Sequence, residues 1–184
     1  MRILGGTLKG RSLSVVVLPG TRPTTDAMRE SLFSTLESHI DWTECTVLDL
    51  FSGTGALGFE ALSRGASHCT FVEKSTSMCR SIERNAKALE LTAQCTVHVE
   101  DVMSMLKRRT GVYDVVFCDP PYDLRSCNQV LRALDSHRIV SDGGVFVAEH
   151  DEREVVVDVK GWQRKASRQR GSTVVDVLQF TDVP

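Results

Sequence analysis

Long hydrophobic runs and paired cysteines are both missing from this 184-residue sequence. The longest apolar runs, such as residues 15–18, are far too short to cross a bilayer, and no apolar signal core follows Arg2. The six cysteines form no C-x-x-C pair, which argues against a zinc site or a redox motif. We therefore expect a cytoplasmic protein that binds no metal and keeps its cysteines reduced, as small buried side chains.

The sequence also lacks a strong net charge, internal repeats and low-complexity linkers. Its formal net charge is -2 with 25% charged residues, so charge alone does not indicate a nucleic-acid binder. A chain of this length fits one core of ordinary size. We expect a small N-terminal extension at residues 1–40, a main domain at residues 41–184, and a monomer.

Apolar patterns after residue 44 alternate between strand and helix periods. The predicted strands lie near residues 46–50, 69–73, 95–99, 113–118 and 144–149, and the predicted helices near residues 56–64, 75–90, 101–108 and 126–136. This alternation predicts an α/β fold, with a parallel sheet covered by helices on both faces.

The two ends of the chain carry further predicted elements. The β-rich residues 154–159 and 173–180 are expected to pair as an antiparallel hairpin at the sheet edge, with residues 160–171 as a long connection. Residues 1–18 predict two short strands. A helix follows, with its apolar face at Met28, Leu32, Phe33, Leu36 and Ile40, and with Arg29 and Glu30 projecting elsewhere.

Residues 47–58, V-L-D-L-F-S-G-T-G-A-L-G, organise the rest of the chain. An apolar strand containing Asp49 runs into Gly53, Gly55 and Gly58, and a helix pattern begins there. The glycines allow a turn with positive φ, a close approach of a ligand to the backbone, and tight packing of helix on strand. This combination predicts a nucleotide site at the carboxyl end of the strand.

The second informative stretch follows the predicted strand at residues 113–118. Asp119, Pro120, Pro121 and Tyr122 leave the sheet in a rigid, extended form. The prolines have no N–H to donate, so this stretch presents carbonyl and carboxylate acceptors to the cleft, together with the aromatic face of Tyr122. Acceptors of this kind suit an exocyclic amine, and the tyrosine suits stacking on a planar base.

These motifs resemble those of a known enzyme group. Residues 119–122 resemble the D/N-P-P-Y/F motif of S-adenosylmethionine-dependent methyltransferases that act on exocyclic or amide nitrogens, and residues 49–58 resemble their first cofactor motif. The wider match is to the RsmD family of 16S rRNA guanine-N2 methyltransferases. It rests also on M-R-I-L-G-G (1–6), K-G-R (9–11), R-P-T-T-D (22–26), R-E-S-L-F (29–33) and E-A-L-S-R-G-A (60–66). The resemblance covers residues 1 to about 150 and is weaker beyond, where Arg170-Gly171 precedes a β-rich run.

The resemblance implies a Rossmann-like class I methyltransferase fold. Its sheet would have seven mostly parallel strands with an antiparallel C-terminal hairpin, and a small β-hairpin and helix would form the N-terminal extension. Residues 41–184 would then be the catalytic domain. The cofactor would be S-adenosylmethionine, with S-adenosylhomocysteine as its product.

The resemblance also implies the cofactor contacts. Its methionine end would meet Asp49, Ser52, Gly53, Gly55 and Gly58, and Ser52 stands where the family suggests alanine. Glu73 lies at the distance beyond the glycines at which an acid binds both ribose hydroxyls. Asp101 is expected to bind the adenine amino group; Glu100 is the alternative, and either could instead cap a helix.

A mechanism follows from the weak nucleophilicity of an aryl amine, whose lone pair is delocalised into the ring. The Asp119 side chain and the Pro120 carbonyl would orient the amine toward the sulfonium methyl and stabilise the developing positive charge. Neither Cys118 nor Cys127 has an evident base, so no covalent intermediate is expected. The target base must be unpaired or flipped, with Tyr122 stacked on it.

Local basic patches are the expected contacts to ribosomal RNA or to the small ribosomal subunit. They comprise Arg2, Lys9, Arg11, Arg22 and Arg29 in the N-terminal extension, and Arg164, Lys165, Arg168 and Arg170 near the C-terminus.

Other functions fit parts of the sequence. The glycine loop followed by Glu73 also satisfies the fingerprint of a nicotinamide-dependent oxidoreductase, although that reading leaves residues 119–122 without a role. A DNA adenine-N6 or protein glutamine-N5 methyltransferase could use a similar tetrapeptide. A noncatalytic RNA-binding module is a third alternative.

Overall fold

The computed structural model describes residues 1–15, 26–108, 111–121 and 126–182. In this part of the chain, seven strands form one sheet in the order β3-β2-β1-β4-β5-β7-β6. The strands are β1 (Thr46–Leu50), β2 (His68–Glu73), β3 (Cys95–Val99), β4 (Tyr113–Cys118), β5 (Val140–Asp151), β6 (Trp162–Arg170) and β7 (Thr173–Phe180). The first five are parallel, and β7 pairs antiparallel with both β5 and β6.

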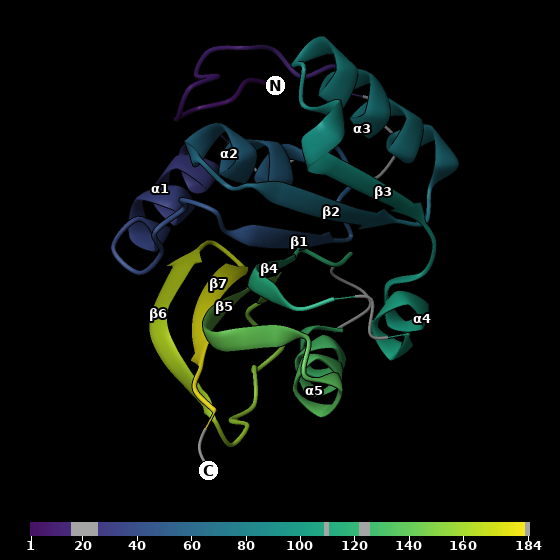
Figure 1. Cartoon of the computed structure of the whole chain (residues 1–184). Helices are drawn as coiled ribbons and strands as arrows, with labels where there is room; N and C mark the ends of the chain where they lie inside the picture. Colours follow the sequence, from purple (N-terminus) through teal and green to yellow (C-terminus); the bar gives the residue numbers. More distant parts are fainter. Residues whose placement is uncertain (16–25, 109–110, 122–125, 183–184) are drawn as a thin grey trace.

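Helices cover both faces of the sheet, as predicted (Figure 1). On one face lie α1 (Asp26–Leu36), α2 (Ala56–Arg64) and α3 (Thr76–Ala88), and a short 3-10 helix, η1 (Thr92–Gln94), leads into β3. The other face carries α4 (Val102–Lys107) and α5 (Cys127–His137). Alternate residues of each central strand enter the two layers: Val115 and Phe117 of β4 pack with α1 and α2, whereas Val116 packs with α4 and α5. The predicted α/β sheet is therefore confirmed.

The C-terminal hairpin differs from the prediction in its first strand. Residues 154–159 were expected to be that strand, but it lies at Trp162–Arg170, in the predicted connection. The pairing of β6 with β7 uses backbone groups, so its polar side chains do not prevent it, and exposed charged residues are typical of an edge strand. Residues 154–159 instead place Val156 in the core and leave Val155 exposed, outside any ladder.

Within residues 1–15, the N-terminal hairpin has less strand pairing than predicted. A single antiparallel bridge joins Arg2 and Ser12, flanked by backbone hydrogen bonds from Ile3 to Arg11 and from Leu13 to Met1. The remainder of the second predicted strand, residues 16–18, lies outside the described residues. In Figure 1 the purple N-terminal segment passes beside α2 and α3.

Arg29 corrects the sequence-based interpretation of the first helix. Its side chain was expected to project away from the apolar face, but it is fully buried. Its Nη2 donates to the Arg2 carbonyl at 2.9 Å and to Asp26 at 2.7 Å, and its Nη1 lies 3.8 Å from Glu60 of α2. Glu60 in turn accepts from the Leu4 amide at 2.8 Å. These contacts join the N-terminal segment and α1 to the main layer of helices.

Candidate active site

The carboxyl ends of the central strands bring the acidic residues of the two motifs together. Asp49 of β1 is level with Phe71 of β2 and Phe117 of β4, so Glu73 and Asp119 follow on either side of it at the same rim of the sheet. A rim of this kind, where a parallel sheet meets its loops, is where open α/β folds bind ligands. The structure therefore gathers three predicted site residues from three strands.

The glycine loop has the backbone that its sequence predicts. Gly53 and Gly55 have φ values of 51° and 75°, in the left-handed region that favours glycine. Gly58 has a different requirement, because a Cβ there would clash with the Phe71 ring and would lie 2.6 Å from the Cys69 sulfur. The last glycine therefore allows α2 to pack directly on β2.

Hydrogen bonds hold this loop to the ends of two strands. The Gly58 amide donates to Asp49 Oδ2 at 3.0 Å, and the Gly53 amide donates to Glu73 Oε2 at 3.1 Å. The other oxygen of Glu73 accepts from the Ser75 amide at 2.8 Å. The loop is thus preorganised by the same carboxylates that the sequence assigned to the cofactor.

Ser52 has a structural role that the motif resemblance did not suggest. Its hydroxyl donates to the Asp49 carbonyl at 2.5 Å and accepts from the Val72 amide at 2.9 Å. The hydroxyl therefore joins β1 to β2, where an alanine could make neither bond.

The electrostatics of the site favour a cationic ligand. Burial raises the pKa of Asp49 well above its usual range; the Gly58 hydrogen bond opposes this shift, and the nearby Asp119 and Glu73 charges add to it. Three carboxylates around one loop would attract the sulfonium and ammonium groups of S-adenosylmethionine. They would repel the pyrophosphate of a nicotinamide dinucleotide.

The substrate side of the rim is formed by the residues after β4. Asp119 is half-buried, Pro120 is buried and Pro121 is exposed. Tyr122 lies outside the described residues, so its predicted stacking role stays a prediction. The neighbouring β5 contributes Glu149, which follows Ala148, the partner of Cys118 in the ladder. Sequence reasoning missed this buried acid, whose signal was its position at the end of the predicted strand at residues 144–149.

The two candidates for the adenine contact both have structural partners. Asp101 caps α4, where its Oδ1 accepts from the Ser104 amide at 2.9 Å. Glu100 lies 2.5 Å from Arg108 and 3.6 Å from His98. The predicted cap is thus present at Asp101, whose side chain is nevertheless exposed, and the amide of the preceding Glu100 donates to the Glu73 carbonyl at 3.1 Å.

The predicted RNA-contacting residues fall into separate groups. Arg2, Lys9 and Arg11 are exposed on the N-terminal segment, and Arg164, Lys165, Arg168 and Arg170 are exposed along β6. Arg22 lies outside the described residues. Arg29 does not belong to this set, because its buried guanidinium is held by Asp26, Glu60 and a backbone carbonyl and is not available to a phosphate.

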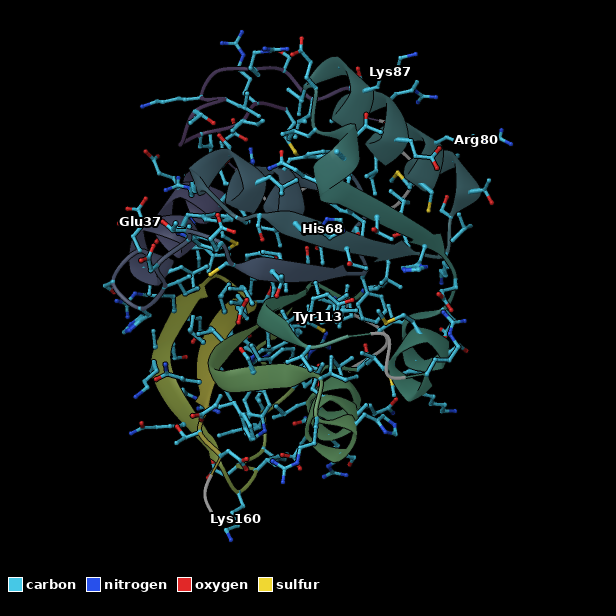
Figure 2. All side chains as sticks on the ribbon, viewed as in Figure 1. Glu37, His68, Arg80, Lys87, Tyr113 and Lys160 are labelled. Atoms are coloured by element: carbon cyan, nitrogen blue, oxygen red, sulfur yellow. The ribbon has the colours of Figure 1, made fainter. Side chains whose placement is uncertain are left out.

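Figure 2 shows further cations on other surfaces. Arg80 and Lys87 point outward from α3, and Lys160 projects at the bottom of the view, before the start of β6. Since β6 spans nine residues, Lys160 is about 30 Å from Arg170 along the strand. It belongs to a different part of the surface.

Within the described ranges, no group of three or more His, Cys, Asp or Glu side chains is placed to hold a metal ion. No helix in the same ranges is long and apolar enough to cross a membrane.

The fold and the acidic, glycine-lined rim define an S-adenosylmethionine-dependent methyltransferase. Residues 1–179 match the family described as "Conserved hypothetical protein 95". The chain therefore belongs to that family, the RsmD family that its motifs resemble. This membership removes the nicotinamide-dependent oxidoreductase from the alternatives.

Individual relatives agree with this assignment. The chain is 42% identical over 159 residues to "Putative rRNA methyltransferase YlbH" of Bacillus subtilis, a match that covers 84% of each chain. It is 34% identical over 151 residues to the Escherichia coli "Ribosomal RNA small subunit methyltransferase D", covering 82% of this chain and 75% of that one. Among solved structures, "Putative methyltransferase yhhF from Escherichia coli" superposes with a TM-score of 0.89 at 27% identity, covering 100% of this chain and 99% of that one.

Proposed function

We propose that this enzyme methylates the exocyclic N2 amine of a guanine in small-subunit (16S) ribosomal RNA. The observation that carries the proposal is the convergence of Asp49, Glu73 and Asp119 at one rim. Asp119 is followed directly by Pro120 and Pro121. Relatives named ribosomal RNA small subunit methyltransferase D support the RNA class of the substrate. Activity on ribosomal RNA also fits the predicted cytoplasmic location.

The described residues suit the two ends of the cofactor differently. Asp49 and the glycine loop would hold the methionine end, where the positive charges are, and Glu73 would bind the ribose hydroxyls. Asp101 would reach the adenine amino group with its exposed carboxylate. When bound, the cofactor supplies an electrophilic methyl group on a sulfonium.

The residues after β4 would act on the amine. The Asp119 carboxylate and the Pro120 carbonyl would accept hydrogen bonds from its N–H groups, which turns the nitrogen lone pair toward the methyl. The same acceptors would stabilise the positive charge that develops on nitrogen during transfer. Tyr122 would stack on the flipped base. Residues 1–40 would serve the catalytic domain, residues 41–184, as an RNA-contacting extension.

Mapping the methylated atom tests the proposal. The protein is incubated with labelled S-adenosylmethionine and, separately, with 16S rRNA, small subunits, DNA and protein, and the labelled product is then identified. Label at guanine N2 of small-subunit RNA is the expected result. Label on adenine N6 of DNA or on glutamine would overturn the proposal and favour the corresponding alternative.

Two variants at one position connect the chemistry to the proposed mechanism. Asp119→Ala removes the side-chain acceptor, so kcat is expected to fall by about 10²–10³-fold while S-adenosylhomocysteine still binds. Asp119→Asn keeps an acceptor oxygen and should retain more activity. An unchanged kcat in Asp119→Ala would contradict the proposed role of Asp119. The noncatalytic RNA-binding alternative predicts instead that the wild-type protein transfers no methyl group and that Asp119→Ala leaves cellular function intact.

A further inference from the structure

A groove lies between α1 and the β6–β7 hairpin, and none of its lining residues belongs to the glycine loop. Its volume is about 210 Å³, and it is lined by Ala27, Met28, Ser31, Leu32, Thr35, Arg168, Gln169, Arg170, Val175 and Val177. Pockets that hold drug-sized ligands usually measure roughly 300–1,000 Å³. The groove is therefore suited to one small planar group rather than to a whole cofactor.

A shift in register along β6 places cations on this side of the sheet. Arg164 pairs with Leu178, but after the irregularity that follows it Ala166 pairs with Val177, and Arg168 pairs with Val175. Val175 and Val177 belong to the core layer beneath α1 and α2, so Arg168 faces α1. Without this shift, the arginine would point toward the opposite face, because side chains alternate along a strand.

The lining combines an apolar floor with positive charge at its edge. Leu32, Val175 and Val177 are buried, whereas Arg168 and Arg170 are exposed. The described lining residues include no acidic side chain. An apolar surface next to two guanidinium groups complements a base and its phosphates, since bases stack on apolar or guanidinium faces and phosphates pair with arginine.

The groove opens at the same rim as the proposed active site. Arg170 pairs with Thr173, which pairs with Asp151 at the carboxyl end of β5. α1 lies beside this end of the hairpin in Figure 1. Two strand spacings of ~4.8 Å separate β4 from β7, and Asp151 lies three residues beyond Ala148, the partner of Cys118 at the end of β4, so the mouth lies about 14 Å from that end.

We propose that this groove binds an unpaired RNA nucleotide that flanks the methylated guanine. The inference rests on the proposed RNA substrate and adds a second subsite to it. Holding a neighbouring nucleotide here keeps the strand unpaired while the target base enters the rim pocket. The arginines bind its phosphates, and the apolar floor covers its base.

Filling the groove tests this subsite without touching the catalytic residues. Ser31→Trp places an indole in the groove from α1, and Ser34→Trp places the same group on an exposed part of the helix that does not line it. Binding of a fluorescent single-stranded RNA nonamer is measured for each variant, with S-adenosylhomocysteine affinity as a check on the cofactor site. Ser31→Trp should weaken nonamer binding about tenfold, and Ser34→Trp should not. Equal affinities for the two variants would overturn the proposal.

Charge removal gives an independent measurement. Arg168→Ala is expected to lower the slope of log affinity against log salt by about 0.7, the value for one phosphate contact in a single strand. Arg132→Ala, on the exposed side of α5, is the matched control and should leave the slope unchanged. An unchanged slope in Arg168→Ala would count against the subsite.

Photocrosslinking locates the nucleotide directly. A nonamer containing 4-thiouridine should crosslink to α1 or to β6 at the groove, and crosslinks confined to α3 or α4 would overturn the subsite. These binding measurements need no methyl transfer. The absence of labelled methyl groups on every RNA in the methylation assay would therefore refute the proposed function without affecting the groove. Tighter binding of an acidic peptide than of the nonamer would refute the ligand proposed for the groove.

Discussion

The Gly58 amide donates a hydrogen bond of 3.0 Å to the Asp49 carboxylate, which joins the end of β1 to the first turn of α2. Asp49 is only 2% exposed, so the negative charge of its carboxylate is costly in the free protein. A helix N-terminus offsets part of that cost. A cationic ligand would offset more, which connects the loop's geometry to its choice of cofactor.

The first prediction concerns the charge of Asp49. Its folded-state pKa is raised by burial above the unfolded value of about 3.9, so the folded protein binds the proton more tightly. The unfolding free energy of the free protein should therefore fall as pH rises from about 4 through the folded pKa. Asp49→Asn does not titrate and should flatten this dependence in urea unfolding. It should also weaken S-adenosylhomocysteine binding more than tenfold, because the ligand's ammonium loses its counter-charge. Parallel pH profiles for the two proteins would contradict this account.

Gly58→Ala tests the packing of α2 on β2. The added Cβ meets the Cys69 sulfur and the Phe71 ring, both fully buried, so neither can move away easily. We expect a loss of about 1–3 kcal/mol in unfolding free energy by urea titration. Gly111→Ala is the control, since its Cβ would have no contact shorter than 3.4 Å, and it should change stability by less than about 0.5 kcal/mol. Similar losses in both variants would contradict the packing argument.

Substitutions at Arg29 distinguish a structural role from a role in RNA contact. Arg29→Ala leaves Glu60 with less compensation in the interior and should cost about 3–5 kcal/mol of stability. Arg29→Met fills the space, and it removes the buried Nε and Nη1 groups that have no hydrogen-bond partner, so its cost should be clearly smaller.

RNA binding by the same variant completes the test. Arg29→Met should keep the wild-type salt dependence, whereas Arg2→Ala, which removes an exposed cation nearby, should lower the slope by about 0.7. A reduced slope in Arg29→Met would restore the original assignment of Arg29 to the RNA surface.

Asp101 has a structural role and a proposed cofactor role that one substitution can separate. Asp101→Ala should cost about 1 kcal/mol of stability through loss of the α4 cap, whereas Asp101→Ser keeps a capping oxygen. If Asp101 also binds the adenine amino group, both variants should bind S-adenosylhomocysteine about tenfold more weakly in calorimetry. Wild-type affinity in Asp101→Ser would restrict Asp101 to the cap.

Much of the fold follows from local patterns. The helix at residues 56–64 and the strands at residues 46–50, 95–99 and 113–118 have the predicted bounds, because apolar periodicity and glycine conformations are properties of neighbouring residues. The sequence also allowed the two acidic motifs to be placed at one rim. Parallel strands that alternate with helices end on the same side of the sheet.

The sequence by itself determined the alternating sheet, the glycine loop and the acids of the rim. Only the tertiary structure decided that residues 162–170 form an edge strand, since backbone pairing with β7 leaves no apolar period to detect. It also decided that Arg29 is internal, because the compensating Glu60 lies on another helix. The groove between α1 and β6 could not be predicted from the sequence, because its walls come from opposite ends of the chain and only packing brings them together.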